Sequence, residues 1–329
     1  VAEEHGDLDS RITLTNFQGL MMYGMMRHRE AIEFYQQALA LWQVRAAQIE
    51  RPRAEPEVTL RERIGSEQWY VGDFDAAQAM LARALILALY RHGIPHTDYL
   101  RETTAFALWS LALVLRSQSD MSDGRVNLLQ MALKRMRSAV RRFEIIGADD
   151  ANMGRLYVQI AEIHLDLAEL YLLEDNDKEA QRMRRLALKR AQQAADFLKH
   201  TDSAAGKLLP ELTLLRYEIT QRLDREALLQ MPEFEARLIR IEHAAAEIGD
   251  AVISAKAATL RGEWCLWLGD PTPAREVLLL ALVGLQHNNM GMATRAQRLL
   301  RRANAPAQDS AHRRAPDGPA APSAQDEQP

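Results

Sequence analysis

Two histidines with the spacing of a metal pair are the first side chains in this sequence that could carry chemistry. His92 and His96 are four residues apart, which on a helix would place both imidazoles on one face and within reach of one zinc ion. Gly93 and Pro95 lie between them, and both residue types interrupt helices. We therefore expect two loop histidines rather than a metal site, and we predict neither a metal nor a cofactor.

Acidic clusters offer two further candidates. Glu162, His164 and Asp166 alternate along a predicted helix, where residues two apart face different directions, so they do not form a site on their own. Residues 174–177 read Glu-Asp-Asn-Asp, but they lack the glycine and the distal glutamate of a calcium loop. A polar turn between helices is the simpler interpretation. Glycine-rich loops that cradle phosphates are absent from the sequence, so we predict a protein that is not an enzyme.

The single cysteine indicates a compartment rather than a reaction. Cys265 lies between Trp264 and Leu266, which predicts a packed thiol, because a nucleophilic thiol needs positive charge nearby. One cysteine allows no internal disulfide and favours a reducing compartment. The longest apolar run, around residues 278–285, is far shorter than a membrane span, and no secretion signal opens the chain. We expect a cytoplasmic protein.

Two basic clusters could bind an acidic partner or a nucleic-acid backbone. They are Lys134, Arg135, Arg137, Arg141 and Arg142 in one predicted helix, and Arg182, Arg184, Arg185, Lys189 and Arg190 in another. The net charge of −4, from 41 basic and 45 acidic residues, argues against a general nucleic-acid coat. A solvated helix face is the plainer interpretation of this basic stripe, and a nucleic-acid-binding solenoid is the alternative function.

The elements that must position these residues are repeated helix pairs. Four segments share one pattern, in which a turn is followed by alanine and by a second alanine seven residues later, so that both lie on one helix face. The first alanines are Ala31, Ala77, Ala180 and Ala274. A small residue eleven or twelve positions upstream marks the same close crossing on the preceding helix: Gly19, Gly65, Ala168 and Gly262.

The spacing of these alanines predicts six helix pairs. The intervals are 46, 103 and 94 residues, so that one further pair fits into each of the two longer intervals. The predicted pairs lie near residues 13–50, 58–92, 103–146, 155–200, 203–248 and 252–287, with a final helix over 290–303 and a disordered tail over 304–329. Glycines at 93, 147 and 249 predict helix ends, and prolines at 232 and 273 predict helix starts. No stretch alternates as a strand does.

These repeats resemble the tetratricopeptide repeat family across roughly 300 residues. The matching segments are residues 30–41, 65–84, 167–187 and 262–281. The long repeats are similar to those of bacterial signal-transduction proteins. The resemblance implies an all-α, right-handed α-solenoid whose first helices line a concave groove for a peptide or a partner helix. The corresponding positions are Asn16, Leu20, Tyr23, Glu62, Ser66, Trp69, Tyr70, Glu162, Glu169, Leu172, Leu173, Thr259, Glu263 and Trp267.

Two features of these groove positions bear on the partner. The aromatic residues could anchor a ligand, although packing between repeats explains them equally well. Chaperone-binding members of the family use Lys and Asn there to clamp a terminal carboxylate, whereas this chain carries Glu62, Glu162, Glu169 and Glu263. We therefore expect a protein-interaction, sensor or scaffold array that does not bind its partner in that way.

The opening residues predict a missing repeat. Residues 4–7 resemble residues 247–250, and Gly6 precedes Gly19 by the interval that separates Gly249 from Gly262. On this pattern residues 1–6 would be the last turn of an earlier second helix. The chain would then be the C-terminal regulatory part of a larger bacterial signalling or transcription-regulatory protein. The first helix would expose apolar residues and could support self-association through the N-terminal end.

Overall fold

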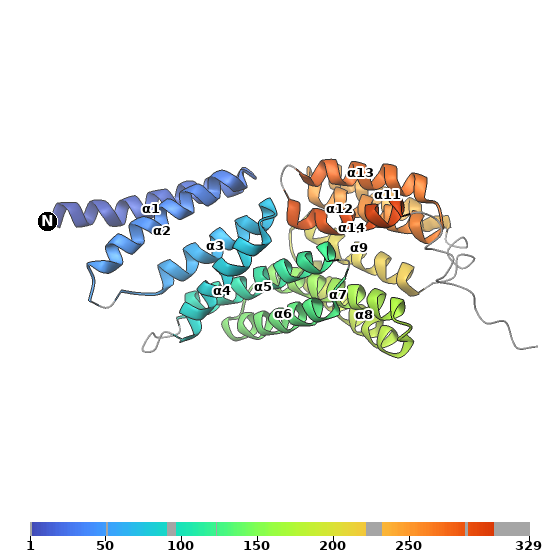
Figure 1. Ribbon diagram of the computed structural model, residues 1–329, viewed down its shortest axis with the longest axis horizontal. Helices are drawn as coiled ribbons and strands as arrows, with labels where there is room; N and C mark the ends of the chain where they lie inside the picture. Colours follow the sequence, from blue (N-terminus) through green and yellow to red (C-terminus); the bar gives the residue numbers. More distant parts are fainter. Residues whose placement is uncertain are drawn as a thin grey trace, which may run out of the picture.

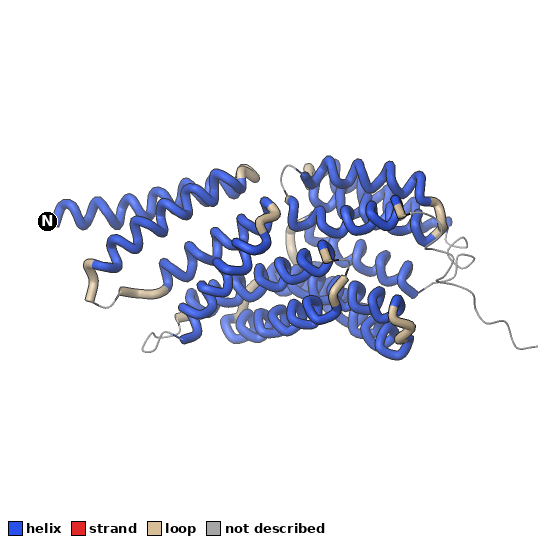
Figure 2. Tube along the Cα trace, in the orientation of Figure 1, coloured by secondary structure: helices blue, strands red, loops and turns tan. Residues whose placement is uncertain are grey.

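The computed structural model describes residues 2–50, 52–90, 97–122, 124–221, 232–286 and 289–305. Within these ranges the chain folds into helices and connecting turns, without a strand (Figure 2). The predicted all-α solenoid is confirmed. The helices are α1 (Ala2–Gly24), α2 (His28–Ala47), α3 (Glu55–Val71), α4 (Phe74–Tyr90), α5 (Asp98–Met121), α6 (Val126–Ile146), α7 (Asp150–Leu173), α8 (Asp177–Lys199), α9 (Ala204–Gln221), α11 (Pro232–Glu247), α12 (Ala251–Trp267), α13 (Pro271–Gln286) and α14 (Met290–Asn304).

Consecutive helices pack as pairs, and the pairs stack. Helices α1 and α2, α3 and α4, α5 and α6, α7 and α8, and α12 and α13 contact each other extensively, while α9 and α11 supply the fifth pair. In Figure 1 the second helices α6, α8 and α13 lie along the outer edges, and the first helices α5, α7, α9 and α12 lie between them. The inner side of the array is therefore built from first helices.

The predicted small residues make the close crossings. Ala31, Ala77, Ala180 and Ala274 are all fully buried, as expected. A Cβ built on Gly65 would lie 2.6 Å from Leu81, the residue four positions after Ala77. The same relation holds between Gly19 and Tyr35 and between Gly262 and Leu278. Glycine at these positions lets a large side chain of the second helix fill the space against the first.

Helix ends follow local chemistry. Asp149 and Asp250 cap α7 and α12, because their carboxylates accept hydrogen bonds from the backbone N–H three residues on. Gly147 ends α6 with φ 64°, a left-handed conformation that favours glycine. Gly249 follows α11 with φ 72°, whereas Gly93 lies outside the described residues. Helix α11 begins at Pro232 as predicted, and α13 begins at Pro271, two residues before Pro273.

The predicted helix end at Gly6 is wrong. Helix α1 runs without a break from Ala2 to Gly24, so residues 4–7 continue a first helix although they resemble the turn at 247–250. A glycine inside a helix lowers its stability by only about 1 kcal/mol, which a long helix packed on a neighbour tolerates. The predicted tail is outside the described residues from 306 onward.

The last helix, α14, closes the inner side. It packs on α13 and α12 as the next first helix would, and it also contacts α5 and α3 from the other end of the array. Gly291 of α14 lies so close to Trp69 of α3 that an added Cβ would come within 2.2 Å of the indole ring. Helix α14 therefore contacts the first helices α3, α5 and α12, and its arginines reach carboxylates of α7.

Candidate functional site

A carboxylate on α7 is the centre of the inner surface. Asp166, which is 1% exposed, accepts hydrogen bonds from the guanidinium groups of three arginines on three other helices. The distances from its oxygens are 2.7 Å to Arg116 Nε on α5, 2.6 Å to Arg216 Nη2 on α9 and 2.6 Å to Arg295 Nη1 on α14. One side chain thus joins four helices, and a buried charge of this kind requires such pairing.

Neighbouring carboxylates extend this arrangement in both directions along α7. Glu162 and Glu169 lie on the same face of the helix as Asp166, four residues before it and three after it. Glu162 accepts a hydrogen bond from Arg116 Nη1 at 2.5 Å, and Lys256 Nζ lies 3.7 Å away. Glu169 accepts hydrogen bonds from two arginines of α14. We call the whole set the ionic cluster: Asp120, Glu162, Asp166, Glu169, Glu263, Arg116, Arg216, Lys256, Arg295, Arg298 and Arg302.

Helix α14 supplies three of the cations. Arg295 donates two hydrogen bonds of 2.7 Å to Glu263 on α12, besides the one to Asp166. Arg298 lies 3.2 Å from both Asp120 and Glu169, and Arg302 donates to Glu169 at 2.5 Å. Positions 295, 298 and 302 share one helix face, which is the face turned toward α5 and α7.

The electrostatics favour ionised acids on α7. Burial opposes ionisation of Glu162, but Lys256 and Arg116 outweigh it and lower the pKa to about 2. Burial likewise opposes ionisation of Glu169, and Arg298 and Arg302 lower its pKa to about 2. Three or more guanidinium groups hold the pKa of Asp166 well below its usual range despite burial. At neutral pH these α7 side chains are negative.

Asp120 on α5 differs from the α7 carboxylates. Burial raises its pKa, and the attraction of Arg298 does not compensate for this loss of hydration. It accepts a hydrogen bond of 3.2 Å from the Thr294 hydroxyl of α14. Of the cations that favour its ionised form, Arg298 and Arg295 belong to α14 and Arg116 to α5.

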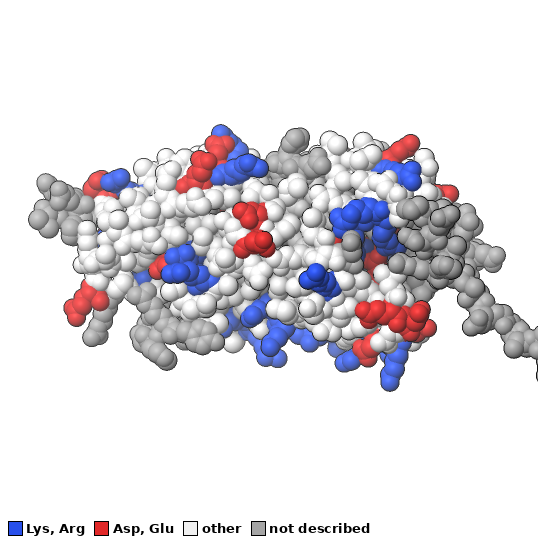
Figure 3. Space-filling model, viewed as in Figure 1, with Lys and Arg blue, Asp and Glu red and all other residues white. Residues whose placement is uncertain are grey.

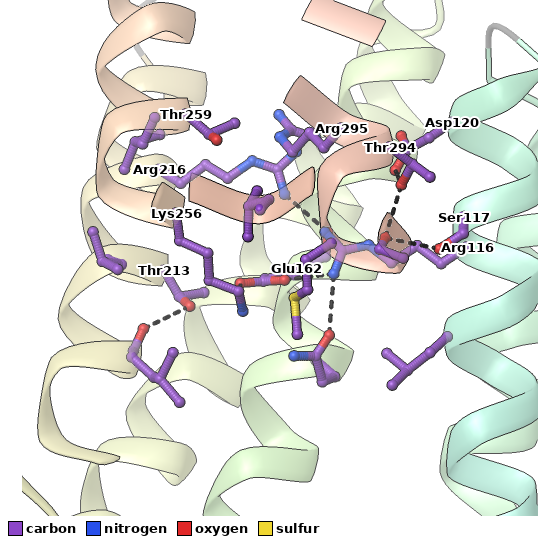
Figure 4. A pocket seen from close by; sticks show the side chains of 18 of the residues that line it. Arg116, Ser117, Asp120, Glu162, Thr213, Arg216, Lys256, Thr259, Thr294 and Arg295 are labelled. Atoms are coloured by element: carbon purple, nitrogen blue, oxygen red, sulfur yellow. Dashed lines mark hydrogen bonds and ion pairs between the residues drawn. The ribbon is translucent and has the colours of Figure 1, made fainter. Parts of the chain in front are cut away.

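A small cavity lies beside the ionic cluster. Its volume is about 80 Å³, enough for a few water molecules and far too small for a peptide. Figure 4 shows Arg116, Glu162, Arg216, Lys256 and Arg295 around it. Arg216 Nε faces this region without a hydrogen-bond partner among the described residues. The inner surface is thus polar and largely filled, and what fills it is α14.

The contact of α14 with α3 and α5 depends on small groups. Trp69 Nε1 donates to Ser117 Oγ at 2.9 Å, and Ser117 Oγ donates to the Gly291 carbonyl at 3.1 Å. These two bonds connect α3, α5 and α14 in sequence. Gly72, which ends α3 with φ 86°, lies against Met290, so that the first turn of α14 sits on the end of α3.

The sequence placed several groove residues on this inner surface. Trp69, Glu162, Thr259 and Glu263 line the cavity, and Glu169 belongs to the ionic cluster. In this structure the partners of these residues are other side chains of the same protein, which cover the inner surface.

The remaining predicted groove residues lie apart. Ser66 Oγ bonds to Glu62 and to Ser110 at 2.7 Å each, and burial raises the pKa of Glu62 to about 7. Tyr70 stacks on His28, and Tyr23 is near both rings. The others do not join the ionic cluster: Asn16 accepts a hydrogen bond from Arg63, Leu20 and Leu173 are exposed, Leu172 is half-buried, and Trp267 packs with the apolar core near α9 and α12.

Sequence reasoning missed the residues that organise the site. Asp166 was set aside with Glu162 and His164, yet Glu162, Asp166 and Glu169 share one face while His164 faces away from them. His164 is buried near Arg137 and Arg190, and burial lowers its pKa to about 4. The usable signal was the spacing of three acids on α7 at positions 162, 166 and 169, matched by three arginines on α14 at 295, 298 and 302.

Other sequence candidates have structural roles or lie outside the described residues. Burial raises the pKa of Cys265, the opposite of what activates a thiol. Asn176, in the acidic turn, caps α8 by accepting from the Glu179 N–H at 3.3 Å. No cluster that could hold a metal occurs among the described residues, which do not include His92 and His96. Among the described helices, none is both long and apolar enough to span a bilayer.

The basic stripe is not continuous. Its residues lie on the outer helices α6 and α8, but Arg184 is buried, and Arg190 lies over the Tyr157 ring at 5.3 Å and donates to Gln193. Burial lowers the pKa of Arg142, which is also close to Arg101. In Figure 3 a group of basic atoms lies along the lower middle of the molecule, and an acidic group lies to its right beside further basic atoms.

The comparisons with known proteins concern the fold. No family profile and no curated protein matches the chain. Among solved structures it is similar to the Rap conjugation gene regulator of the plasmid pLS20 in complex with the Phr* peptide, with a TM-score of 0.54 and 15% identity over 92% of this chain and 75% of that chain. A Rap protein complexed with Competence and Sporulation Factor (TM-score 0.49, 13% identity, 95% and 81% of the chains) and the apo form of RapI (0.43, 12%, 92% and 73%) follow. At these identities the first similarity establishes the helical-repeat fold alone.

Proposed function

We propose that this protein is a non-enzymatic sensor or scaffold that binds a peptide, or a segment of a partner protein, on its inner surface. The observation that carries the proposal is the ionic cluster, in which charged side chains from five helices meet in the interior of a repeat array. Burying so many charges stabilises a fold less than an apolar core of the same volume would. Their presence on the surface where helical-repeat proteins bind their partners favours a role in recognition.

A solved structure with this fold supports the same class of ligand. The Rap conjugation gene regulator is described in complex with the Phr* peptide, and it shares the helical-repeat fold with this chain. We extend to the present protein only the class of ligand, a peptide or protein segment. A regulatory role in bacterial signalling and a cytoplasmic location accompany this proposal.

Selection from a displayed peptide library, followed by titration of the selected peptides, tests the proposal. Lys256 lines the cavity at the edge of the ionic cluster, and Lys178 is an exposed lysine on the outer helix α8. Changing a charged group beside the ligand should alter the binding free energy by about 1–3 kcal/mol. We expect Lys256→Gln to change the affinity of the selected peptides and Lys178→Gln to leave it unchanged.

Two results would overturn the proposal. One is the absence of any selected peptide, and the other is equal sensitivity of peptide binding to both lysine substitutions. The alternative, nucleic-acid binding through the basic stripe, predicts an affinity for DNA or RNA that falls steeply with salt. That affinity would be lost in Arg135→Ala, whereas peptide binding to the inner surface would be retained.

A further inference from the structure

We infer that α14 occupies the place of the ligand, and that the ligand is a helical segment with arginines spaced as they are in α14. The inference rests on the proposed function and names the chemistry of its partner. The segment would displace α14 from α5 and α7, so binding and release of α14 would be one event. Three features of α14 support this: the charge that it neutralises, the face that it uses, and the contact that holds it in place.

The first feature is the charge that α14 neutralises. The side chains that α5 and α7 contribute to the ionic cluster are the acids Asp120, Glu162, Asp166 and Glu169 and the base Arg116. We call these four acids the acidic face. Without α14, the acidic face and Glu263 of α12 keep three cations, Arg116, Arg216 and Lys256, in the described part of the chain. An uncompensated negative surface enclosed by helices attracts a cationic segment.

The second feature is the helix face that α14 uses. Arg295, Arg298 and Arg302 project from one side of α14 toward Asp166, Asp120 and Glu169. An adjacent side of α14 belongs to an apolar core, where Ala296 and Leu299 are buried with Leu278 and Leu282 of α13. The arginine side therefore recognises the acidic face, while the apolar side holds α14 to its own repeat. A free helix with the same arginine spacing could form the same charge-assisted hydrogen bonds.

The third feature is the small contact between α14 and α3. Helix α14 touches α3 through Gly291 and Met290, and the Gly291 carbonyl accepts the hydrogen bond from Ser117. Thr294 and Arg298 contact Asp120, whose pKa is raised by burial. Arg216 also lines the cavity, and its Nε, 3.8 Å from a Glu263 oxygen, makes no hydrogen bond within the described part of the chain. The contact of α14 with α3 itself therefore involves few groups.

Gly291 allows α14 to be loosened without altering any charged residue. A Cβ at this position would meet the Trp69 ring at 2.2 Å, so Gly291→Ala should push α14 away from α3. Gly284 on α13 is the matched control, since a Cβ there would lie 3.7 Å from Ala255, an ordinary contact. Both glycines lie in helices, so alanine should favour helix formation equally at the two sites.

The probe is a labelled synthetic peptide of residues 289–305, titrated into the full-length protein by fluorescence anisotropy. In the unaltered protein the chain's own α14 competes with the probe, and a binding-competent state of low population weakens the apparent affinity in proportion. We expect Gly291→Ala to bind the probe at least tenfold more tightly than the unaltered protein and Gly284→Ala do. A probe with Glu at 295, 298 and 302 should not bind any of the three.

Hydrogen exchange gives a second measurement that does not depend on the variants. Saturating the unaltered protein with the probe should increase exchange in residues 290–304 of the chain itself, because the displaced α14 loses its partners. If Gly291→Ala, shown by circular dichroism to be folded, binds the probe no better than Gly284→Ala, α14 is a structural part and the inference fails. Failure of the probe to increase exchange in α14 contradicts displacement.

The library selection described above separates this inference from the proposed function. If the selected peptides lack arginine, or bind without increasing exchange in α14, the inner surface is a binding site and the inference about its ligand is wrong. If the library selection yields no peptide even when Gly291→Ala is the target protein, the proposed function fails as well. If arginine-bearing peptides are selected and their affinities rise in Gly291→Ala, both stand.

Discussion

Replacing Asp166 with asparagine should destabilise the protein strongly, because the change keeps the shape of the side chain and removes the charge that joins four helices. Asparagine keeps one acceptor oxygen but turns an NH₂ group toward guanidinium groups. Arg116 would keep Glu162 at 2.5 Å, and Arg295 would keep Glu263 at 2.7 Å. Arg216 would keep a hydrogen bond of 3.3 Å to the Glu162 carbonyl, but its remaining carboxylate contacts, to Glu169 and Glu263, are both at 3.8 Å. The main loss is therefore one buried arginine left without a close carboxylate.

The expected destabilisation follows from the contacts that are lost and retained. Removing one partner of a buried ion pair typically destabilises a protein by about 3–5 kcal/mol. The contacts retained by Arg116 and Arg295 place the expected loss for Asp166→Asn near the lower value, about 3 kcal/mol at pH 7. Asp196→Asn on α8 is the matched control, since this carboxylate is exposed on the outer side. A surface change of that kind alters the free energy of unfolding by less than about 0.5 kcal/mol.

Urea denaturation and hydrogen exchange would measure the effect. A repeat array need not unfold in one step, so hydrogen exchange in α14 and α9 should be measured in addition to the urea midpoint. The pKa of Asp166 is lowered in the folded state, so its stabilisation is complete above the unfolded pKa of about 3.9 and is lost as the pH falls through the folded value. The difference between Asp166→Asn and the unaltered protein should narrow only below about pH 4. Equal urea midpoints for Asp166→Asn and Asp196→Asn at pH 7 would refute the reasoning.

Three further predictions concern other parts of the molecule. Ala77→Leu should overpack the crossing of α3 and α4 and lower the free energy of unfolding by about 1–3 kcal/mol, and an unchanged melting temperature would contradict the register. Glu62 has a pKa raised to about 7, so the stability from its neutral form is complete below its unfolded pKa and is lost as the pH rises through 7. Glu62→Gln should therefore gain stability relative to the unaltered protein between pH 5 and pH 8, and parallel pH profiles in thermal melts would argue against this. Phe17 and Met21 on α1 are 57% and 45% exposed, so we predict that the protein self-associates through this helix. Sedimentation should show less self-association in Phe17→Ser/Met21→Ser, and a monomeric unaltered protein would exclude the prediction.

The helix pairs were predictable from the sequence because the signals that specify them are local. Ala77 and Ala84 occupy one face two helical turns apart, and Gly65 marks the preceding helix of the same pair, within some twenty residues of chain. Local periodicity also placed Glu162, Glu169 and Glu263 on first helices. It misled at Gly6, because the same short pattern can end a helix or continue one, and packing on a neighbouring helix decides between them.

Only the tertiary structure decided what the first helices face. Asp166 and Arg295 are 129 residues apart, and their contact depends on small rotations between successive repeats that add up until α14 meets α5 and α3. No short-range pattern encodes that sum, so an acidic groove open to a partner and an acidic groove filled by α14 look alike in the sequence. Nothing in the local sequence distinguishes the three arginines of α14 from exposed ones, and only the curvature of the array brings them onto the acids of α7.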